Sequence, residues 1–180
     1  MTGGKRALVI GCGYVGLALV RALRARNAEV IGTSRSEARY PEIAAAGAIP
    51  ATADVMDPSS LKPLAALAPD VVFDLVKPQA IGESRYTSWG TSNVTGAFGR
   101  LPLEALVYLS STSVYGRREG EWTDEETPLN PSSPLGKARV EAEKIYMDCY
   151  RDLGARVRIA RVPGIYGPGR TLRQRLETGA

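Results

Sequence analysis

Short apolar runs alternate with longer amphipathic stretches along almost the whole chain. Each run is rich in Val, Ile, Leu and Ala and is bounded by polar residues, Gly or Pro, which is typical of strands buried on both faces of a parallel sheet. Six strands are predicted, at 7–10, 28–33, 48–53, 70–76, 105–110 and 155–162. The intervening stretches predict helices at 17–27, 36–47, 57–67, 133–153, from a start within 82–86 to about 98, and in the last eleven residues.

Strands that alternate with helices predict an α/β fold with a doubly wound parallel sheet, the Rossmann fold. The expected strand order is 3-2-1-4-5-6, with the ligand crevice at the carboxyl ends of the first and fourth strands, where the order reverses. The 180 residues have the length of one domain, so we expect a single unit over residues 1–180.

The first strand runs directly into a glycine-rich turn, GCGYVG, and a helix follows at once. In this strand–turn–helix context, G-x-G-x-x-G predicts dinucleotide binding more strongly than an ordinary glycine-rich turn. Gly11 allows the tight turn, Gly13 lets a diphosphate approach the backbone, and Gly16 lets the helix pack against the strand. Tyr14 and Val15 lie at the helix start, where free N–H groups and the helix dipole would hold phosphates.

The end of the second strand predicts which dinucleotide is bound. An acidic residue there would bond the ribose 2′-hydroxyl of NAD, but this chain has Ser34 followed by Arg35, with Arg39 one helical turn further on. A guanidinium can pair with a 2′-phosphate, so we predict NADP, with NAD as the alternative. Arg35 could instead stack on the adenine or face solvent. Leu75, where the fourth strand ends, is predicted as a further cofactor contact.

Composition and charge narrow the function classes. The chain is 44% hydrophobic and 23% charged, and its 23 basic residues are scattered among 19 acidic ones for a net charge of +4. This modest positive field favours an anionic dinucleotide rather than nucleic acid. No apolar run is long enough to span a membrane, and no signal peptide is recognised.

The chemical inventory excludes two kinds of site. The chain has no histidine, and its two cysteines, Cys12 and Cys149, form no C-x-x-C pair. A zinc site and a Ser-His-Asp or Cys-His catalytic unit are therefore not expected. Free thiols suit a reducing compartment, so we expect a cytoplasmic protein.

Four stretches together resemble a known family. They are GCGYVG at 11–16, Asp54-Val55 after the third strand, LSSTSVYG at 109–116 followed by the acidic Asp124-Glu125-Glu126 and then Pro128 and Pro131, and RVPGIYGPG at 161–169. In this order they are similar to the extended or atypical short-chain dehydrogenases/reductases of the NAD(P)-dependent epimerase/dehydratase type. The resemblance implies that Asp54 and Val55 lie beside the adenine, and that Pro163 contacts the cofactor.

The chain departs from that family at its catalytic helix. The family carries Tyr-x-x-x-Lys there, usually within P-Y-G-x-S-K, whereas this chain has Leu135 at the tyrosine position and Arg139 at the lysine position. Lys137 is displaced by two residues, which turns it by about 200° on a helix. Family members also continue with a C-terminal part that supplies further strands and most of the substrate pocket. We expect this part to be largely absent here.

The resemblance implies roles for the remaining site residues. In the family the tyrosine is the general acid/base, the lysine binds the nicotinamide ribose, and a serine orients the substrate oxygen. Ser111 matches that serine, and Arg139 could bind the ribose, but neither Leu135 nor Arg139 is a proton donor near neutral pH. Tyr115 and Tyr166 are candidates for the proton donor because they are tyrosines, although a structural role in the loops is favoured for both.

Three hypotheses of function follow. The first is an NADP-preferring oxidoreductase or epimerase that acts on a small hydroxylated substrate such as a nucleotide sugar. The second, motivated by Leu135 and Arg139, is a non-catalytic dinucleotide-binding sensor or scaffold. The third is a truncated fragment, whose exposed strand edge would favour self-association. Because many relatives pair through the helices beside the sheet, a homodimer is a further option.

Overall fold

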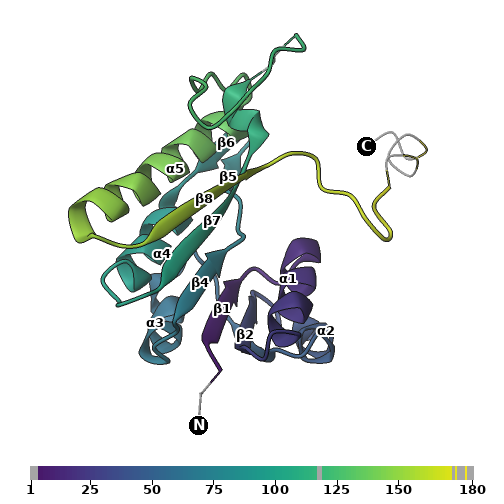
Figure 1. Ribbon diagram of the computed structural model, residues 1–180, viewed down its shortest axis with the longest axis vertical. Coiled ribbons are helices and arrows are strands. Elements are labelled where there is room, and N and C mark those ends of the chain that lie inside the picture. Colours follow the sequence, from purple (N-terminus) through teal and green to yellow (C-terminus); the bar gives the residue numbers. More distant parts are fainter. Residues whose placement is uncertain (1–3, 117–118, 172, 174–176, 178–180) are drawn as a thin grey trace.

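The computed structural model describes residues 4–116, 119–171, 173 and 177. Six parallel strands form one sheet in the order β3-β2-β1-β4-β7-β8, with helices on both faces (Figure 1). The strands are β1 (Arg6–Ile10), β2 (Glu29–Ser34), β3 (Ile49–Thr52), β4 (Val71–Asp74), β7 (Ala105–Ser111) and β8 (Val157–Val162). The helices are α1 (Tyr14–Arg24), α2 (Tyr40–Ala45), α3 (Pro58–Ala66), α4 (Trp89–Phe98) and α5 (Pro134–Leu153).

The alternation of side chains along each strand divides the core into two layers. In β1, Leu8 and Ile10 pack with residues of α3, α4 and α5, while Val9 packs with residues of α1 and α2. All three side chains are almost completely buried, as expected for a central strand covered on both faces. The predicted α/β fold and strand order are thus confirmed, with β7 and β8 as the fifth and sixth strands of the main sheet.

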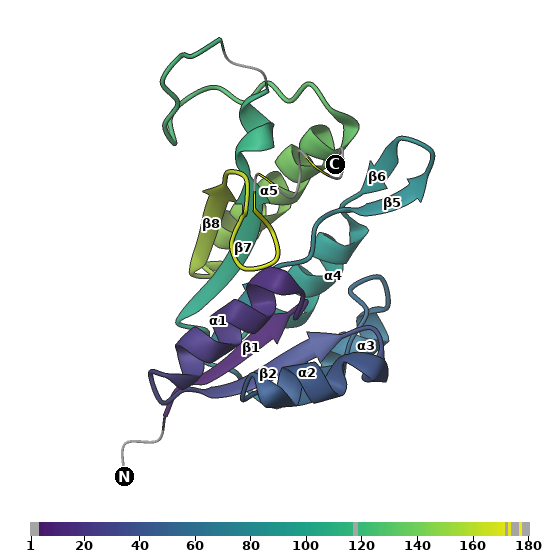
Figure 2. The same ribbon diagram turned by 90° about the vertical axis from the view of Figure 1, so that its right-hand side faces the viewer.

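A small hairpin stands where a helix start was predicted. Strands β5 (Gln79–Gly82) and β6 (Arg85–Thr87) pair antiparallel, and α4 begins only at Trp89 (Figure 2). Gly82 and Ser84 both have positive φ, at 150° and 55°, which turns the chain back instead of continuing it as a helix. The predicted start of the helix within 82–86 is therefore wrong.

Two further predicted elements differ in detail from the structure, and a third lies mostly outside the described residues. The predicted helix 36–47 begins as a 3-10 turn (Glu37–Arg39) and continues as α2, with Pro41 in the first helical turn, where proline is tolerated. The predicted loop 111–134 opens with a 3-10 turn, Thr112–Tyr115. Most of the helix predicted in the last eleven residues lies outside the described residues.

Candidate dinucleotide-binding site

Two cavities open at the carboxyl ends of the central strands. The larger has a volume of about 550 Å³ and the smaller about 400 Å³. Gly11, Gly13 and Lys77 line both, so the glycine turn forms the boundary between them. This is the crevice position predicted from the strand order.

The three motif glycines each have a distinct geometry. Gly11 has φ +91°, and an added Cβ would lie 2.9 Å from a methyl group of Val76. At Gly16 an added Cβ would lie 2.6 Å from the backbone oxygen of Gly11, so any side chain would push the helix off the turn. At Gly13 an added Cβ would meet nothing within 4 Å. The backbone of Gly13 thus borders open space into which a phosphate group would fit.

The N-terminus of α1 faces this space without a competing anion. Its N-cap is Gly13, no side chain caps it, and its first turn contains no acidic residue. The first backbone N–H groups of a helix have no intrahelical partners, and together with the helix dipole they favour a bound anion. The glycine turn and this helix start are therefore compatible with a dinucleotide diphosphate.

Cys12 lies within the glycine turn, and its thiol has low reactivity. Its thiol is buried, and burial raises the pKa of Cys12 to about 11. Its backbone N–H donates to the Thr33 carbonyl at 2.8 Å, which ties the turn to β2. Cys12 therefore positions the turn and is a neutral thiol near neutral pH.

The larger cavity gathers the residues predicted for the adenosine half of the cofactor, namely Ser34, Arg35, Asp54 and Val55. The Arg35 side chain is exposed and has no hydrogen-bond or ion-pair partner among the described residues. Arg39 lines the same cavity, but it is already engaged: it donates to the Cys12 carbonyl at 3.2 Å and pairs with Glu42 at 2.9 Å. Within the part of the chain that the structure describes, Arg35 is thus the unpaired arginine of the two.

The smaller cavity gathers the other predicted contacts: Tyr14, Val15, Gly16, Leu75, Ser111, Arg139 and Pro163. Arg139 also donates to the Leu109 carbonyl at 3.3 Å. Leu135, one turn earlier on α5, is half-buried and lines neither cavity. The Ser111 hydroxyl accepts the Ser113 N–H at 3.2 Å and caps the 3-10 turn that begins there.

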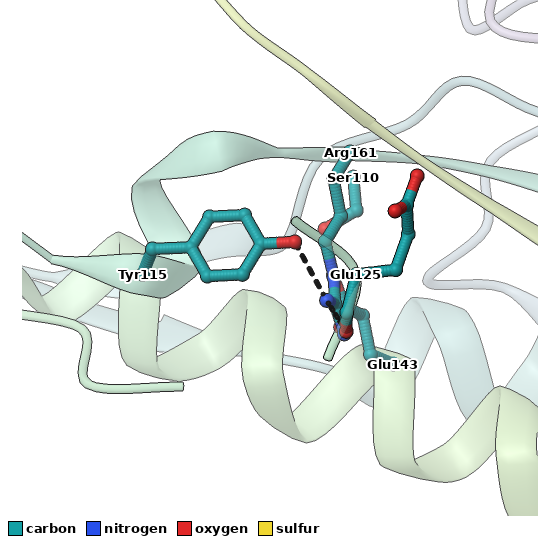
Figure 3. A network of polar contacts seen from close by, with 5 residues as sticks. All are labelled: Ser110, Tyr115, Glu125, Glu143 and Arg161. Carbon is teal, nitrogen blue, oxygen red and sulfur yellow. Dashed lines mark hydrogen bonds and ion pairs between the residues drawn. The ribbon is translucent and has the colours of Figure 1, made fainter. Parts of the chain in front are cut away.

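Tyr115 lies in a different place from Ser111. It is 6% exposed and lines a third cavity of about 630 Å³, separate from the glycine turn. Its hydroxyl accepts a hydrogen bond from Arg161 at 2.8 Å, and the guanidinium also lies 5.1 Å from the centre of its ring (Figure 3). The structure does not bring Tyr115 and Ser111 into one cavity, and Tyr166 is largely exposed.

A buried ion pair organises that third cavity. Arg161 of β8 binds the carboxylate of Glu143 of α5 at 2.9 Å, and the side chain of Glu143 is 4% exposed (Figure 3). Ser110 donates a hydrogen bond to the same carboxylate, and Arg161 donates to the Glu125 carbonyl at 3.2 Å. Glu143 had no predicted role. Its place on the helical stripe of the buried Ala142 and Tyr146 is the only signal available.

A second buried carboxylate, Asp74, directly precedes the segment Leu75–Lys77, whose residues line the two crevice cavities. It ends β4 and is 2% exposed. One carboxylate oxygen accepts the Val76 N–H at 3.0 Å, and the other accepts the Tyr146 hydroxyl at 2.6 Å. Burial raises the pKa of Asp74 to about 6, although both hydrogen bonds lower it. Asp74 thereby holds the turn at Leu75–Lys77, which lines both cavities.

Within the described residues, no group of three or more His, Cys, Asp or Glu side chains could hold a metal ion. Among the described helices, none combines the length and apolar character needed to cross a membrane.

Comparison with known proteins identifies relatives over most of the chain. Residues 7–178 match the model of the NAD dependent epimerase/dehydratase family. Protein YeeZ of Escherichia coli K12 is 31% identical over 174 residues, which cover 92% of this chain and 61% of YeeZ. UDP-glucose 4-epimerase of Mycolicibacterium smegmatis is 29% identical over 163 residues, covering 82% of this chain and 52% of the epimerase.

A solved structure extends the similarity to three dimensions. A Methylobacillus flagellatus protein, provisionally assigned as an NAD-dependent epimerase/dehydratase, superposes with a TM-score of 0.76 and 34% identity. The match covers 98% of this chain and 59% of that protein. The chain therefore spans between about half and three fifths of the length of these three relatives.

Proposed function

The chain belongs to the NAD dependent epimerase/dehydratase family, and from this membership we propose that it binds a nicotinamide dinucleotide across the two crevice cavities, with a preference for NADP. The observation that carries the proposal is the open space at Gly13 facing the uncapped start of α1. Residues 1–180 are proposed to act as one dinucleotide-binding unit. The adenosine half would lie against Ser34, Arg35, Asp54 and Val55.

The preference for NADP is supported by charge at the end of β2. A carboxylate at that position would repel a 2′-phosphate, but the residue there is Ser34. Arg35 follows it with its guanidinium unpaired among the described residues, so it can form a charge-assisted, two-pronged bond to a phosphate. Arg39, which is held by Cys12 and Glu42, would add positive charge without a direct bond.

We further propose an oxidoreductase or epimerase activity on a small hydroxylated substrate such as a nucleotide sugar. The M. smegmatis relative, a UDP-glucose 4-epimerase, supports this substrate class. When bound, the dinucleotide supplies hydride transfer. Ser111 would hydrogen-bond a substrate oxygen, and Arg139 would hold the nicotinamide ribose in the smaller cavity.

A second candidate function is favoured by Leu135 and Arg139. Leucine carries no proton, and arginine stays charged near neutral pH, so neither can replace the family's general acid/base. Tyr115 is hydrogen-bonded to Arg161 in a separate cavity. A chain that binds the dinucleotide without turning it over would act as a sensor or a scaffold.

Titration of the purified chain with NADPH and NADH, followed by nicotinamide fluorescence, tests the cofactor proposal. Arg35→Asp should weaken NADPH binding by about 10- to 100-fold and NADH binding by less than about 3-fold, because one charge-assisted contact is lost and a repulsion is added. The matched control is Arg100→Asp, an exposed arginine just beyond α4 and outside both cavities. Equal loss of both dinucleotides in Arg35→Asp would overturn the NADP preference.

A further inference from the structure

The segment after β8 reaches across to the start of α1, far from it in the sequence (Figure 1, Figure 2). The segment forms a tight turn there, in which the backbones of Gly167 and Arg170 exchange hydrogen bonds of 3.1 and 2.9 Å. The Tyr14 hydroxyl donates to the Pro168 carbonyl at 3.2 Å. An added Cβ at Gly167 would lie 2.4 Å from that hydroxyl, so the turn fits closely on Tyr14.

This contact brings the Arg170 side chain to the glycine turn. Its guanidinium lies 5.1 Å from the centre of the Tyr14 ring and lines the smaller cavity. Among the described residues it forms no ion pair. A cation–π contact with Tyr14 uses none of the N–H donors of the guanidinium, so Arg170 is held near the glycine turn with these donors still available.

The charge of the smaller cavity points to an anion. Among the described residues, Lys77, Arg139 and Arg170 line it, and no Asp or Glu does. Cations that share a cavity repel one another, and a bound anion removes that cost. The uncapped start of α1 lies against the same cavity and favours the same charge.

We propose that Arg170 binds the diphosphate of the nicotinamide dinucleotide, and that Tyr14 positions it by holding the turn at Gly167–Arg170. The proposal rests on the proposed function, because it adds a side-chain ligand to the same site. The guanidinium would form paired hydrogen bonds to phosphate oxygens, complementing the backbone N–H groups of the glycine turn.

The test measures the dissociation constants of NADPH, NADH and UDP for the full chain and its variants. Arg170→Ala should weaken both dinucleotides by about 10- to 100-fold and reduce the salt dependence of binding, since one phosphate contact is lost. Arg170→Lys should retain part of the affinity, because lysine keeps the positive charge but lacks the paired N–H donors of the guanidinium. The control is Arg173→Ala, an exposed arginine paired with Glu177 at 2.8 Å, which should change affinity by less than about 2-fold.

The outcomes separate this proposal from the one on which it rests. If the unaltered chain binds neither dinucleotide, both proposals fail. If it binds them and Arg170→Ala binds them equally well, only the role of Arg170 is overturned. Weakened UDP binding with unchanged dinucleotide binding would also overturn it, because Arg170 would then serve a nucleotide substrate.

Discussion

The two halves of the crevice differ in what they keep of the family pattern. The larger cavity, which we propose to hold the adenosine half of the cofactor, is lined by Asp54, Val55 and Arg35, and Arg35 has no hydrogen-bond or ion-pair partner among the described residues. The smaller cavity, which we propose to hold the nicotinamide half, is lined by Ser111, Pro163 and Arg139, but Leu135 and Arg139 are predicted to stand at the family's tyrosine and lysine positions. Binding depends on backbone geometry and charge spread over many residues, whereas proton transfer depends on one positioned group. A chain can therefore lose the second and retain the first.

The most direct test of this difference restores the family's tyrosine and lysine. Leu135→Tyr combined with Arg139→Lys should raise nicotinamide-dependent turnover of nucleotide sugars by about 10²- to 10⁴-fold, the usual contribution of a positioned general acid/base. Affinity for NADPH should change by less than about 10-fold, since the glycine turn is untouched. Initial rates across a panel of nucleotide sugars and small carbonyl compounds provide the measurement.

The matched control for that experiment is Leu135→Phe combined with Arg139→Lys, which adds the same ring without the hydroxyl. Gain in the tyrosine variant alone would support an active site that has lost its acid. Fast turnover by the unaltered chain would instead contradict the sensor hypothesis and show that another group transfers the proton.

A second effect is expected at the glycine turn, where the two cavities meet. Gly13→Val should weaken NADPH and NADH alike by about 1000-fold, because the side chain enters the open space and removes about two charge-assisted hydrogen bonds of about 2 kcal/mol each. The free energy of unfolding should fall by only about 1 kcal/mol, since the new Cβ meets nothing within 4 Å and only the N-cap residue is less suitable.

Binding titration and urea unfolding of the same preparation check both parts of this prediction. Gly16→Ala gives the contrast, because its Cβ would lie 2.6 Å from a backbone oxygen and should cost stability directly. A Gly13→Val protein that binds dinucleotides normally would argue against a diphosphate at this turn.

The smallest effect concerns the buried carboxylate of Asp74. Its pKa is raised to about 6 by burial, so between about pH 4 and pH 6 the folded protein keeps a proton that the unfolded chain has released. The free energy of unfolding should therefore fall as pH rises through this window, by about 3 kcal/mol in all, and level off above it. Asp74→Asn, which cannot ionise, should remove this fall.

Urea unfolding at pH 4, 5, 6 and 7 measures the two curves. Tyr146→Phe sharpens the assignment, because the Tyr146 hydrogen bond lowers the pKa of Asp74 and its loss should extend the window to higher pH. Parallel curves for the unaltered chain and Asp74→Asn would contradict the prediction.

The parts of the structure that follow from local chemistry were the ones predictable from sequence. The parallel strands, the glycine turn and the crevice position depend on apolar runs and on glycine geometry, which are visible in the chain. The β5–β6 hairpin was missed because its strands are short and its turn uses Ser84 at φ 55°, a conformation rare outside glycine, asparagine and aspartate.

The buried polar groups were harder to predict for a different reason. Asp74 stands in a run of Val, Phe and Leu that suggests only an apolar strand, and its partner Tyr146 is 72 residues away. Glu143 likewise meets Arg161 only because α5 packs on β8. Such pairs are set by tertiary contact, and a single sequence carries no local signal for them.

The burial of both cysteines has a practical consequence for chemical labelling. With a pKa of about 11, Cys12 is a thiolate in only about one molecule in ten thousand at pH 7, and burial raises the pKa of Cys149 as well. Maleimide dyes should therefore leave both untouched. A cysteine introduced at the exposed Ile81, on the hairpin beside the adenosine half, would carry a single fluorophore that reports on that half alone.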